Sequence, residues 1–510
     1  MGDLRKLKVG IGQVPIVEGR PSANEAAVDR MIERALDAGA DVLVVPASLD
    51  NGENVRLIGL NDSRIDIAGS DVLLEANGDS YRISVGEQVP ECDFCVLGDA
   101  SPYTIVPDGR SVPRSALVVK PVGMRDSGSR VLAYDGGSAV YDANGKAIAR
   151  LKDGFEEDFQ TVTLAEGGTV ERSVENKPLE AIVATMKRFD ELVMPWKPTW
   201  VIGLSGGLDS SVVAALLVMA FGPERVKAYN LATRFNSEAT KSNAQLIADQ
   251  LGIPLANGSI EELVVALGNT AVQYGYPVDA LSGLVLENAQ ARTRGQLLST
   301  FSALENGVVV NNGNRVECAF GYATLYGDSI GALAPIGDLT KVQLFDVARA
   351  INAGLGFDAV PTNLIPTETD EGCEWVTMPS AELASGQVDP MKWFYHDWLV
   401  GELQGDWFPE PRTLDDAACD VMERYLEDRL ESDGMGKWVR YYGLDDPKAF
   451  ADDLEWAVRS MRAATFKCIQ APPKIALASP ATVALQDASQ VAPEPSSRYN
   501  VLMRKLRAES

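Results

Sequence analysis

The sequence predicts an α/β protein with two main domains, the second built on a doubly wound parallel sheet. Residues 201–222 read as a buried β-strand, a glycine turn and an apolar helix. From residue 201 to about 375, strands and long helices alternate, which is typical of a parallel sheet covered on both faces. A polar, glycine-bearing and aperiodic stretch at 166–180 predicts a linker before this domain.

The first domain, predicted over residues 1–165, opens with a strand, a helix and a strand at 7–14, 23–40 and 41–46. Further strand-like segments follow at 71–76, 81–87, 92–98 and 115–122. Residues 129–151 are predicted to form a pair of hairpins, with turns at Asp135-Gly136-Gly137 and at Asn144-Gly145. These elements predict an α/β sandwich.

The second domain is predicted over residues 181–475, after a helix expected near 179–194. Its strands are expected near 199–203, 226–231 and 307–311. Its helices are expected near 210–221, 238–251, 285–303 and 340–353. From about residue 390 the chain is helical and acidic, and residues 476–510, rich in Pro, Ala and Ser, are expected to form an irregular tail.

The bulk composition narrows the class of protein. The 510 residues include 46 Lys and Arg against 72 Asp and Glu, a net charge of −26, which argues against a nucleic-acid-binding protein. No apolar run predicts a signal peptide or a membrane span. Six scattered cysteines suit a reducing compartment, so a cytoplasmic protein is expected.

The chain has a single histidine, His396. One imidazole nearly excludes Ser-His-Asp triads, histidine-rich zinc sites and multi-histidine iron sites. His396 lies among aromatic residues, and we expect it to be structural.

The turn in residues 205–210 carries the most specific chemical signal. Gly206 and Gly207 let successive backbone N–H groups point into one concavity, and the helix that follows adds its positive end. Asp209 within such a phosphate cradle implies a bridging cation, of which Mg²⁺ is the usual one. No lysine follows the two glycines, so the turn is not a Walker A loop. The alternative is an ordinary strand–helix turn.

Three further blocks supply polar groups where an ATP-using enzyme needs them. Residues 287–295 place Asn288 and Arg292 four apart on one helix face, where they could hold phosphates or a carboxylate; a solvated helix face is the alternative. Residues 311–341 begin after an apolar strand and offer Glu317 as a second metal ligand, with Lys341 able to neutralise phosphate charge. Residues 379–383 offer the hydroxyl of Ser380.

Together these motifs resemble a known family. SGGLDS is typical of PP-loop ATP pyrophosphatases, and SGGLDSS, ATRFNSEATKSNA, ENAQARTRG, GNRVE with GYATLYGD, PSAELASGQVD and FKCIQAPP resemble NAD synthetases of the two-domain, glutamine-using type. The resemblance spans roughly residues 195–475. It implies that ATP adenylates the carboxylate of deamido-NAD with release of pyrophosphate, and that ammonia then displaces AMP to give NAD.

The resemblance also implies residue roles. The ATP phosphates are expected on Ser205, Gly206, Gly207, Leu208, Asp209, Ser210 and Ser211. The rest of the ATP site is expected to comprise Arg234, Arg294, Asn312 and Lys341. Deamido-NAD is expected on Asn288, Arg292, Glu317, Tyr322 and Lys467, and Mg²⁺ on Asp209 and Glu317. The expected catalytic residues are Asp209, Lys341, Ser380 and Asp328, the last orienting ammonia. Asn312 stands where the family usually has Thr, and it can still donate a hydrogen bond.

The first 165 residues resemble the nitrilase-type amidase domain of these synthetases, through KVGIGQV, ALDAGADVLVVP, GDASPY and LAYDGGSAVYDANGKAIARL. Such a domain hydrolyses glutamine with a Glu, a Lys and a nucleophilic Cys. Here Ala47 replaces the Glu, Gly86 (before Glu87) replaces the Cys, and no lysine can be assigned. We therefore expect an inactive amidase domain, kept for oligomer contacts or for docking a separate ammonia-donating protein.

Cys92 and Cys95 form a C-x-x-C pair, a spacing used in metal and redox chemistry. With no second pair and no nearby histidine, zinc is not expected; the thiols are expected to be structural or incidental, with an alternative nucleophile left open. The favoured function is an ammonia-dependent NAD synthetase, a homodimer or larger. The alternatives are a glutamine-dependent NAD synthetase with a non-standard nucleophile, another PP-loop adenylating amidotransferase, and a non-catalytic nucleotide-binding scaffold.

Overall fold

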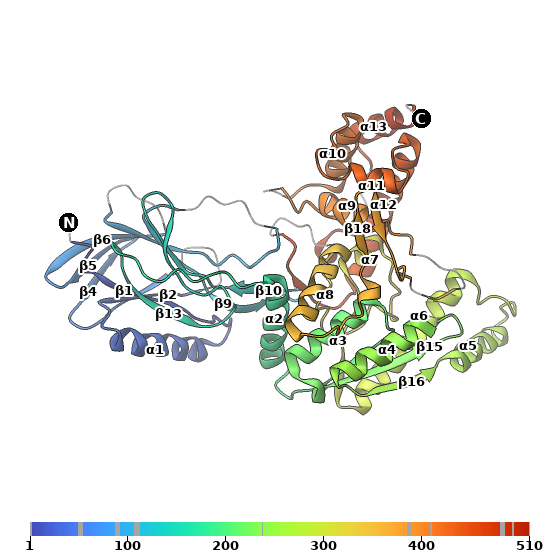
Figure 1. The fold of residues 1–510 in the computed structure, drawn as a ribbon, viewed down its shortest axis with the longest axis horizontal. Coiled ribbons are helices and arrows are strands. Elements are labelled where there is room, and N and C mark those ends of the chain that lie inside the picture. Colours follow the sequence, from blue (N-terminus) through green and yellow to red (C-terminus); the bar gives the residue numbers. More distant parts are fainter. Residues whose placement is uncertain are drawn as a thin grey trace. The chain divides into compact units, whose positions relative to one another are not determined.

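The chain divides into two compact units in a computed structural model, shown in Figure 1. The structure describes residues 3–48, 55–86, 92–106, 113–236, 238–380, 382–384, 389–408, 411–479, 485–491 and 494–508. The first unit comprises residues 1–127 and 131–193, and the second comprises 128–130 and 194–510. The first unit thus takes in residues 166–180, and the helix α2 (Lys177–Val193) ends it. The domain limits given above remain predictions.

The first unit contains two larger β-sheets, apart from the antiparallel pair formed by β9 (Val122–Asp126) and β10 (Arg130–Asp135). One has the strand order β13-β1-β2-β3, with bounds Asp158–Thr163, Lys8–Gln13, Val42–Pro46 and Val55–Gly59. The other has the order β12-β11-β8-β7-β6-β5-β4, with bounds Ala147–Arg150, Ala139–Tyr141, Ala116–Val119, Phe94–Gly98, Asp79–Val85, Asp71–Ala76 and Arg64–Ala68. Parallel pairing joins β1 to β2, β6 to β7 and β7 to β8. The strands predicted in this part of the chain are therefore confirmed.

Apolar side chains of both sheets form one core, which includes Leu7, Ile11, Val44, Leu74 and Leu117. The helix α1 (Pro21–Asp37) buries Val28, Met31 and Ala35 in a second core with Leu43 and Val45 of β2. In β5, alternate residues point into the sandwich and the others are exposed, as expected for a strand with one solvated face. The predicted α/β sandwich is confirmed, with α1 on the first sheet.

One of the two predicted hairpins is wrong. The strand β10 (Arg130–Asp135) pairs antiparallel with β9 (Val122–Asp126), not with β11. Gly136 and Gly137 both have φ of +74°, and the N–H of Gly137 donates to Oε1 of Gln13 at 2.9 Å. The two glycines therefore carry the chain past the end of β1 from one sheet to another, instead of closing a hairpin. The hairpin β11–β12, which turns at Asn144-Gly145, is confirmed.

The second unit contains a four-stranded parallel sheet of order β16-β15-β14-β17, with bounds Leu255–Ser259, Val226–Ala232, Thr199–Gly203 and Gly307–Val309. The strand order reverses at β14, because β15 lies on one side of it and β17 on the other. The helices that connect these strands pack against the sheet, as expected for a doubly wound fold. β16 was not predicted, because LANGS has neither alternation nor an apolar run and its side chains are mostly exposed.

Four helices around this sheet lie close to their predicted positions: α3 (Leu208–Phe221), α4 (Glu238–Leu251), α6 (Gly283–Leu304) and α8 (Lys341–Leu355). The helices α5 (Glu261–Gln273) and α7 (Arg315–Phe320) were not predicted. The short strands β18 (Thr367–Thr369) and β19 (Gly372–Glu374) pair with each other, and β20 (Lys474–Ala476) is bridged to Ala334. One-turn 3₁₀ helices lie at Pro223–Arg225, Thr362–Leu364 and Leu485–Asp487.

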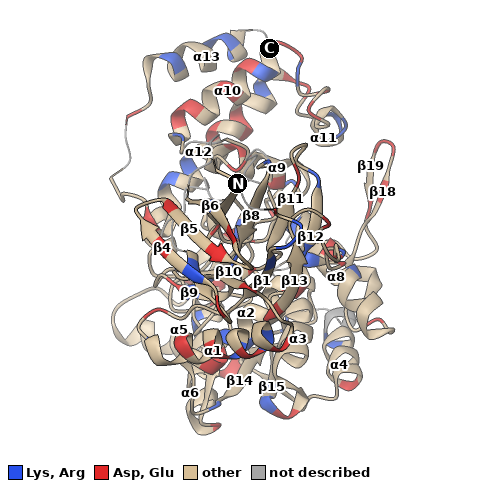
Figure 2. Cartoon of the chain, turned by 90° about the vertical axis from the view of Figure 1, so that its left-hand side faces the viewer, with Lys and Arg blue, Asp and Glu red and all other residues tan. Residues whose placement is uncertain are grey.

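The acidic segment after residue 390 is helical, as predicted, and forms α9 (Tyr395–Gln404), α10 (Leu414–Leu426), α11 (Gly436–Tyr441) and α12 (Pro447–Cys468). Residues 476–510 differ from the predicted irregular tail, because they include α13 (Ser497–Ala508), which buries Tyr499, Met503 and Leu506. Acidic residues on α10 face basic residues on α13 (Figure 2), and Arg498 donates to Asp420 at 2.9 Å and to Glu423 at 2.7 Å. The tail helix thus neutralises part of the acidic helix.

His396 on α9 is fully buried in this helical region, in agreement with a structural role. Its Nε2 lies 3.0 Å from Asp453 Oδ2, its Nδ1 accepts a hydrogen bond from the N–H of Lys392, and its ring stacks on Trp456. None of the described helices combines the length and the apolar character needed to cross a lipid bilayer.

Candidate functional site

The glycine turn joins β14 to α3 at the carboxyl end of the sheet. Gly206 has φ of +86°, a conformation that favours glycine over residues with a Cβ. The N–H of Gly207 donates to Ser205 Oγ at 3.2 Å, and Ser210 Oγ donates to the carbonyl oxygen of Gly207 at 3.1 Å. These contacts fix the turn at the N-terminal end of α3, where the helix dipole favours an anion.

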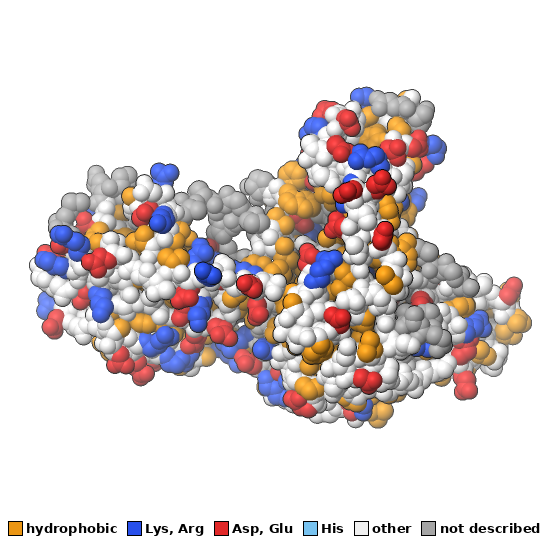
Figure 3. Space-filling model, in the orientation of Figure 1, with side chains coloured by type: hydrophobic (Ala, Val, Ile, Leu, Met, Phe, Trp, Pro, Cys, Tyr) orange, Lys and Arg blue, Asp and Glu red, His pale blue; other side chains and the backbone are white. Residues whose placement is uncertain are grey.

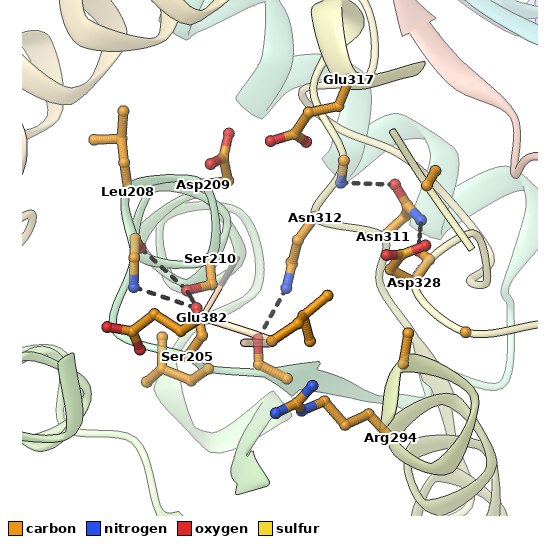
Figure 4. Close-up of a pocket in the computed structure, with 18 of the residues that line it drawn as sticks. Ser205, Leu208, Asp209, Ser210, Arg294, Asn311, Asn312, Glu317, Asp328 and Glu382 are labelled. Atoms are coloured by element: carbon orange, nitrogen blue, oxygen red, sulfur yellow. Dashed lines mark hydrogen bonds between the residues drawn. The ribbon is translucent and has the colours of Figure 1, made fainter. Parts of the chain in front are cut away.

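A cavity of about 360 Å³ opens beside this turn, between the ends of β14 and β17 (Figure 4). This is the place where the strand order reverses, and ligands of open α/β sheets bind at such points. From the turn, the cavity is lined by Ser205, Gly207, Leu208, Asp209 and Ser210. Ser211 is fully buried in α3 instead, and its hydroxyl donates to Gly207 O at 2.6 Å. Gly206 sets the shape of the turn without lining the cavity.

Two distant carboxylates and one ammonium group meet inside the cavity. Lys341 Nζ, at the start of α8, lies 2.5 Å from Asp209 Oδ2 and 3.8 Å from Glu317 Oε1. Asn314, the N-cap of α7, donates from Nδ2 to Asp209 Oδ1 at 3.0 Å, and its backbone N–H donates to Glu317 Oε2 at 3.3 Å. Figure 4 shows Asp209 and Glu317 facing each other. The structure therefore brings together the acids of α3 and α7.

Burial and charge shift the protonation of this cluster. Burial, followed by the like charge of Asp209, raises the pKa of Glu317 above its ordinary value. Burial alone would lower the pKa of Lys341, but the charges of Asp209 and Glu317 outweigh it and raise that pKa. The side chain of Lys341 is only 2% exposed. It is therefore a buried ammonium ion, kept charged by the two carboxylates. The cluster thus places a cation, the Lys341 ammonium, between two carboxylates. A metal ion bound to a phosphate also lies between negatively charged groups.

Arg294 and Asp328 form the opposite wall. Arg294, on α6, donates from Nε to the carbonyl oxygen of Leu231 at 2.9 Å, and burial lowers the pKa of its guanidinium to about 10. The Asp328 carboxylate accepts the N–H of Thr324 at 2.5 Å, and burial raises the pKa of Asp328. Both side chains line the cavity. This wall therefore offers one cation and one carboxyl group of raised basicity.

Asn312 lies between these walls and has an unsatisfied acceptor. Its Nδ2 donates to the carbonyl oxygen of Gly203 at 2.9 Å, which fixes the orientation of the amide. Its buried Oδ1 has no hydrogen-bond partner among the described residues. A buried acceptor of this kind costs about 1–3 kcal/mol unless a ligand donates to it. Asn312 Oδ1 is therefore placed to accept a hydrogen bond from a hydroxyl or amino group of a ligand.

Tyr322 and Ser380 also line the cavity, whereas several predicted site residues lie outside its lining. Asn288 and Arg292 both contact the 324–325 segment: Thr324 Oγ1 donates to Asn288 Oδ1 at 2.8 Å, and Arg292 Nε donates to Leu325 O at 3.2 Å.

Two further predicted residues are also absent from the cavity lining. Lys467 donates to the carbonyl oxygens of Gly321 and Ala323, both at 2.8 Å. Arg234 pairs with Glu261 at 3.2 Å and is largely exposed.

The structure adds residues that the sequence reasoning missed. Asn314 positions both acids, and the pattern Asn-x-x-Glu at 314–317 is a capping-box signal that could have identified it. Glu382 lines the cavity, accepts a hydrogen bond from Asn236 Nδ2 at 3.1 Å and has φ of +49°. Nothing in the local sequence marks Glu382 as a site residue. Within the described residues, no group of three or more His, Cys, Asp or Glu side chains is arranged to hold a metal by itself.

The first unit offers little chemistry at the corresponding strand ends. Ala47 follows β2 directly and is exposed, Gly86 follows β6 with φ of +87°, and Glu87 lies outside the described residues. Beside Ala47 a small depression is lined by Pro46, Ser48, Gly98, Asp99, Ala100, Val119 and Pro121. Lys120 points elsewhere, since its Nζ lies 2.9 Å from Asp135 Oδ1.

Comparison with known proteins agrees with the geometry of the second unit. Residues 195–396 match the family model described as NAD synthase. Residues 195–396 therefore form an NAD synthase domain. A glutamine-dependent NAD(+) synthetase of Xanthomonas campestris is 29% identical over 382 residues, which are 70% of this chain and 65% of that protein. The alignments span about half to two thirds of the length of the first curated relatives.

Solved structures show the same two-part fold. A glutamine-dependent NAD(+) synthetase from Cytophaga hutchinsonii matches 98% of this chain and 99% of its own, with a TM-score of 0.67 and 15% identity. The glutamine-dependent NAD+ synthetase from Acinetobacter baumannii in complex with ADP matches 96% of this chain and 100% of its own, with a TM-score of 0.58 and 19% identity. The chain thus combines a nitrilase-like unit with a PP-loop NAD synthase domain, as predicted.

Proposed function

We propose that the chain is an NAD synthetase, an AMP-forming carbon–nitrogen ligase that converts deamido-NAD to NAD with ATP and free ammonia. The observation that carries this proposal is the cluster of Asp209, Glu317 and Lys341 beside the glycine turn of the NAD synthase domain. ATP would lie with its phosphates on this turn. The unsatisfied Oδ1 of Asn312 supports nucleotide binding, because ribose hydroxyls and the adenine amino group are donors.

The donor set at Asp209 and Glu317 fits Mg²⁺. This ion usually takes one or two carboxylates and completes its shell with water and substrate phosphates, so a cluster of three protein ligands is not required. When bound, the ion would neutralise charge on the phosphates of ATP. Lys341 would keep a contact with the phosphates once its carboxylate partners turn to the metal.

The chain's own residues then account for two steps. In the first, a carboxylate oxygen of deamido-NAD attacks the α-phosphorus and pyrophosphate leaves; Lys341 and Arg294 stabilise the charge on the transferred and departing groups. In the second, ammonia attacks the activated carbonyl carbon and AMP leaves. The carboxylate of Asp328, whose pKa is raised, orients ammonia and takes its surplus proton. The hydroxyl of Ser380 donates to the acyl-adenylate.

Free ammonia is proposed as the nitrogen source because Ala47 and Gly86 replace the groups that an amidase would use. The similarity to glutamine-dependent NAD(+) synthetases favours a second candidate, glutamine dependence with a non-standard nucleophile. On the first proposal the nitrilase-like unit serves oligomer contacts or docks a separate ammonia-donating protein. Measuring glutamate release by the purified chain distinguishes the two.

The deamido-NAD residues outside the cavity lining suggest that the binding surface is completed by a second copy. Exposed apolar side chains on and after α5 (Figure 3) support a homodimer or larger oligomer; they include Leu263, Val265, Leu267, Tyr274, Tyr276 and Val278. Sedimentation velocity tests this proposal. All six cysteines are thiols, and we propose a reducing, cytoplasmic setting on that ground.

One experiment separates the remaining alternatives. The purified chain is incubated with ATP, Mg²⁺, deamido-NAD and ammonium, and the products are resolved by chromatography. NAD with stoichiometric AMP supports the proposal. Activity on another acid substrate would indicate a different adenylating amidotransferase, and nucleotide binding without any product would indicate a scaffold.

A further inference from the structure

The first unit contains a pair of thiols that the proposed synthetase chemistry does not use. The Sγ atoms of Cys92 and Cys95 lie 3.1 Å apart. Cys95 is buried on β7, whereas Cys92, just before that strand, is half-buried and reachable from solvent. A disulfide needs a sulfur–sulfur separation of about 2 Å, so the two atoms have only about 1 Å to close.

The backbone at Asp93 and Cys95 is fixed by contacts with the neighbouring strands. The N–H of Asp93 donates to the carbonyl oxygen of Arg82 at 2.8 Å, and Asp93 Oδ2 accepts the N–H of Arg82 at 2.9 Å. Cys95 is paired in register with Ser84 of β6 and Ala116 of β8. Asp93 and Cys95 are thus held against β6, which limits the ordering entropy lost when the bond forms.

The other four cysteines lack this combination. Burial raises the pKa of Cys318 to about 12 and of Cys419 and Cys468 to about 11, which keeps these thiols protonated and unreactive. The Sγ of Cys468 donates to the carbonyl oxygen of Cys318 at 3.3 Å, and that of Cys373 lies 3.8 Å from the Tyr441 hydroxyl. The C-x-x-C pair combines a short sulfur–sulfur distance with a half-buried member, and it lies outside the lining of the proposed synthetase cavity, which includes Cys318.

We propose that Cys92 and Cys95 form a reversible dithiol–disulfide site that exchanges with small-molecule disulfides such as oxidised glutathione. The Cys92 thiolate attacks one sulfur of the external disulfide, forms a mixed disulfide and releases one thiolate. The Cys95 thiolate then attacks the Cys92 sulfur, forms the Cys92–Cys95 bond and releases the second thiolate. Two electrons pass to the external disulfide, and the two protons of the protein thiols end on the released thiols. The inference is independent of the proposed synthetase function.

The full chain is equilibrated in buffers of graded reduced-to-oxidised glutathione ratio, quenched in acid, alkylated with a maleimide under denaturing conditions and analysed by intact mass and peptide mapping. We expect the loss of two alkylatable thiols in one step, mapped to the peptide that holds both Cys92 and Cys95, and their full recovery with dithiothreitol. If both thiols stay alkylatable in the most oxidising buffer, or if the two thiols lost belong to other cysteines, the inference is wrong.

Single variants test the order of the steps. In Cys95→Ser, Cys92 should accumulate as a stable glutathione mixed disulfide, because no second thiol resolves it. In Cys92→Ser, the buried Cys95 should be modified at least about tenfold more slowly, because the attacking thiol must be accessible. Cys419→Ser is the matched control and should form the disulfide like the parent chain. Equal glutathione adducts on both single variants would overturn the assignment of Cys92 as the attacking thiol. The parent titration keeps the test valid if a variant does not fold.

Discussion

The residues that follow the parallel strands differ in kind between the two units. In the second unit, β14 leads into a turn with Ser205 and Asp209, and a lysine and a second acid converge on it. In the first, β2 and β6 lead into Ala47 and Gly86. Both units nonetheless bury many apolar side chains. The comparison teaches that burial of apolar strands maintains a fold, whereas the groups at the strand ends can differ from one unit to the other.

The largest effect is expected from Asp209→Asn. This change removes one negative charge beside Lys341 and one proposed metal ligand, so NAD formation should fall by about 10²- to 10³-fold or more. The measurement is the initial rate of NAD formation at saturating ammonium. Asp249→Asn on α4, an exposed carboxylate outside the cavity lining, is the control and should keep the parent rate. A rate for Asp209→Asn within about twofold of the parent would show that the carboxylate of Asp209 is not needed for NAD formation, and that the second unit does not differ from the first in this respect.

The second effect concerns the nitrogen donor. If Ala47 and Gly86 leave the first unit without amidase groups, as proposed, the rate with glutamine should lie at least about 10²-fold below the rate with ammonium. Initial rates with each donor, together with glutamate release, provide the measurement. Cys92→Ser should leave any residual glutamine rate unchanged. A glutamine rate equal to the ammonium rate, lost in Cys92→Ser, would show that the first unit has kept an amidase with a different nucleophile.

The cores of the two units should respond alike to a matched cavity. Leu74 on β5 and Leu216 on α3 are both fully buried. Leu74→Ala and Leu216→Ala should each lower the free energy of unfolding of their own unit by about 2–5 kcal/mol. Urea unfolding, followed with proteolysis to assign each transition to a unit, checks this. Ammonia-dependent turnover at low temperature should persist in Leu74→Ala. A loss of turnover there with the second unit still folded would show that the synthetase site depends on the first unit.

Much of this architecture could be predicted from local sequence. The helix α4 and the strands β5 and β14 were predicted to the residue, because periodicity and flanking glycines define them. The approach of Asp209 to Glu317 followed from two segments that both end at the carboxyl edge of the sheet. Non-local pairing could not be predicted in the same way. Between β10 and β11, the N–H of Gly137 donates to Gln13 Oε1, far away in the sequence. The orientation of the Asn312 amide, which leaves its Oδ1 without a partner, is set by a hydrogen bond to Gly203, 109 residues away.

The smallest effect concerns pH and the chain's single histidine, which lies in the second unit. Burial, opposed by Asp453, lowers the pKa of His396 below its unfolded value of about 6.5. As pH falls through that value, the unfolded chain binds a proton that folded His396 does not, so the second unit loses stability toward acid.

Asp453, whose own pKa is lowered, titrates below this window. Carboxyls of raised pKa, such as Asp328 and Asp397, contribute with the opposite sign and are common to parent and variant. In His396→Gln, the free energy of unfolding of the second unit should therefore fall less steeply between pH 7 and 5.5 than in the parent. The difference should be smaller than the loss of stability caused by either core substitution, and the pH dependence of the first unit should not change. The urea midpoints of both units, measured against pH, give the two slopes; an unchanged slope for the second unit would mean that buried His396 takes up its proton in the folded state.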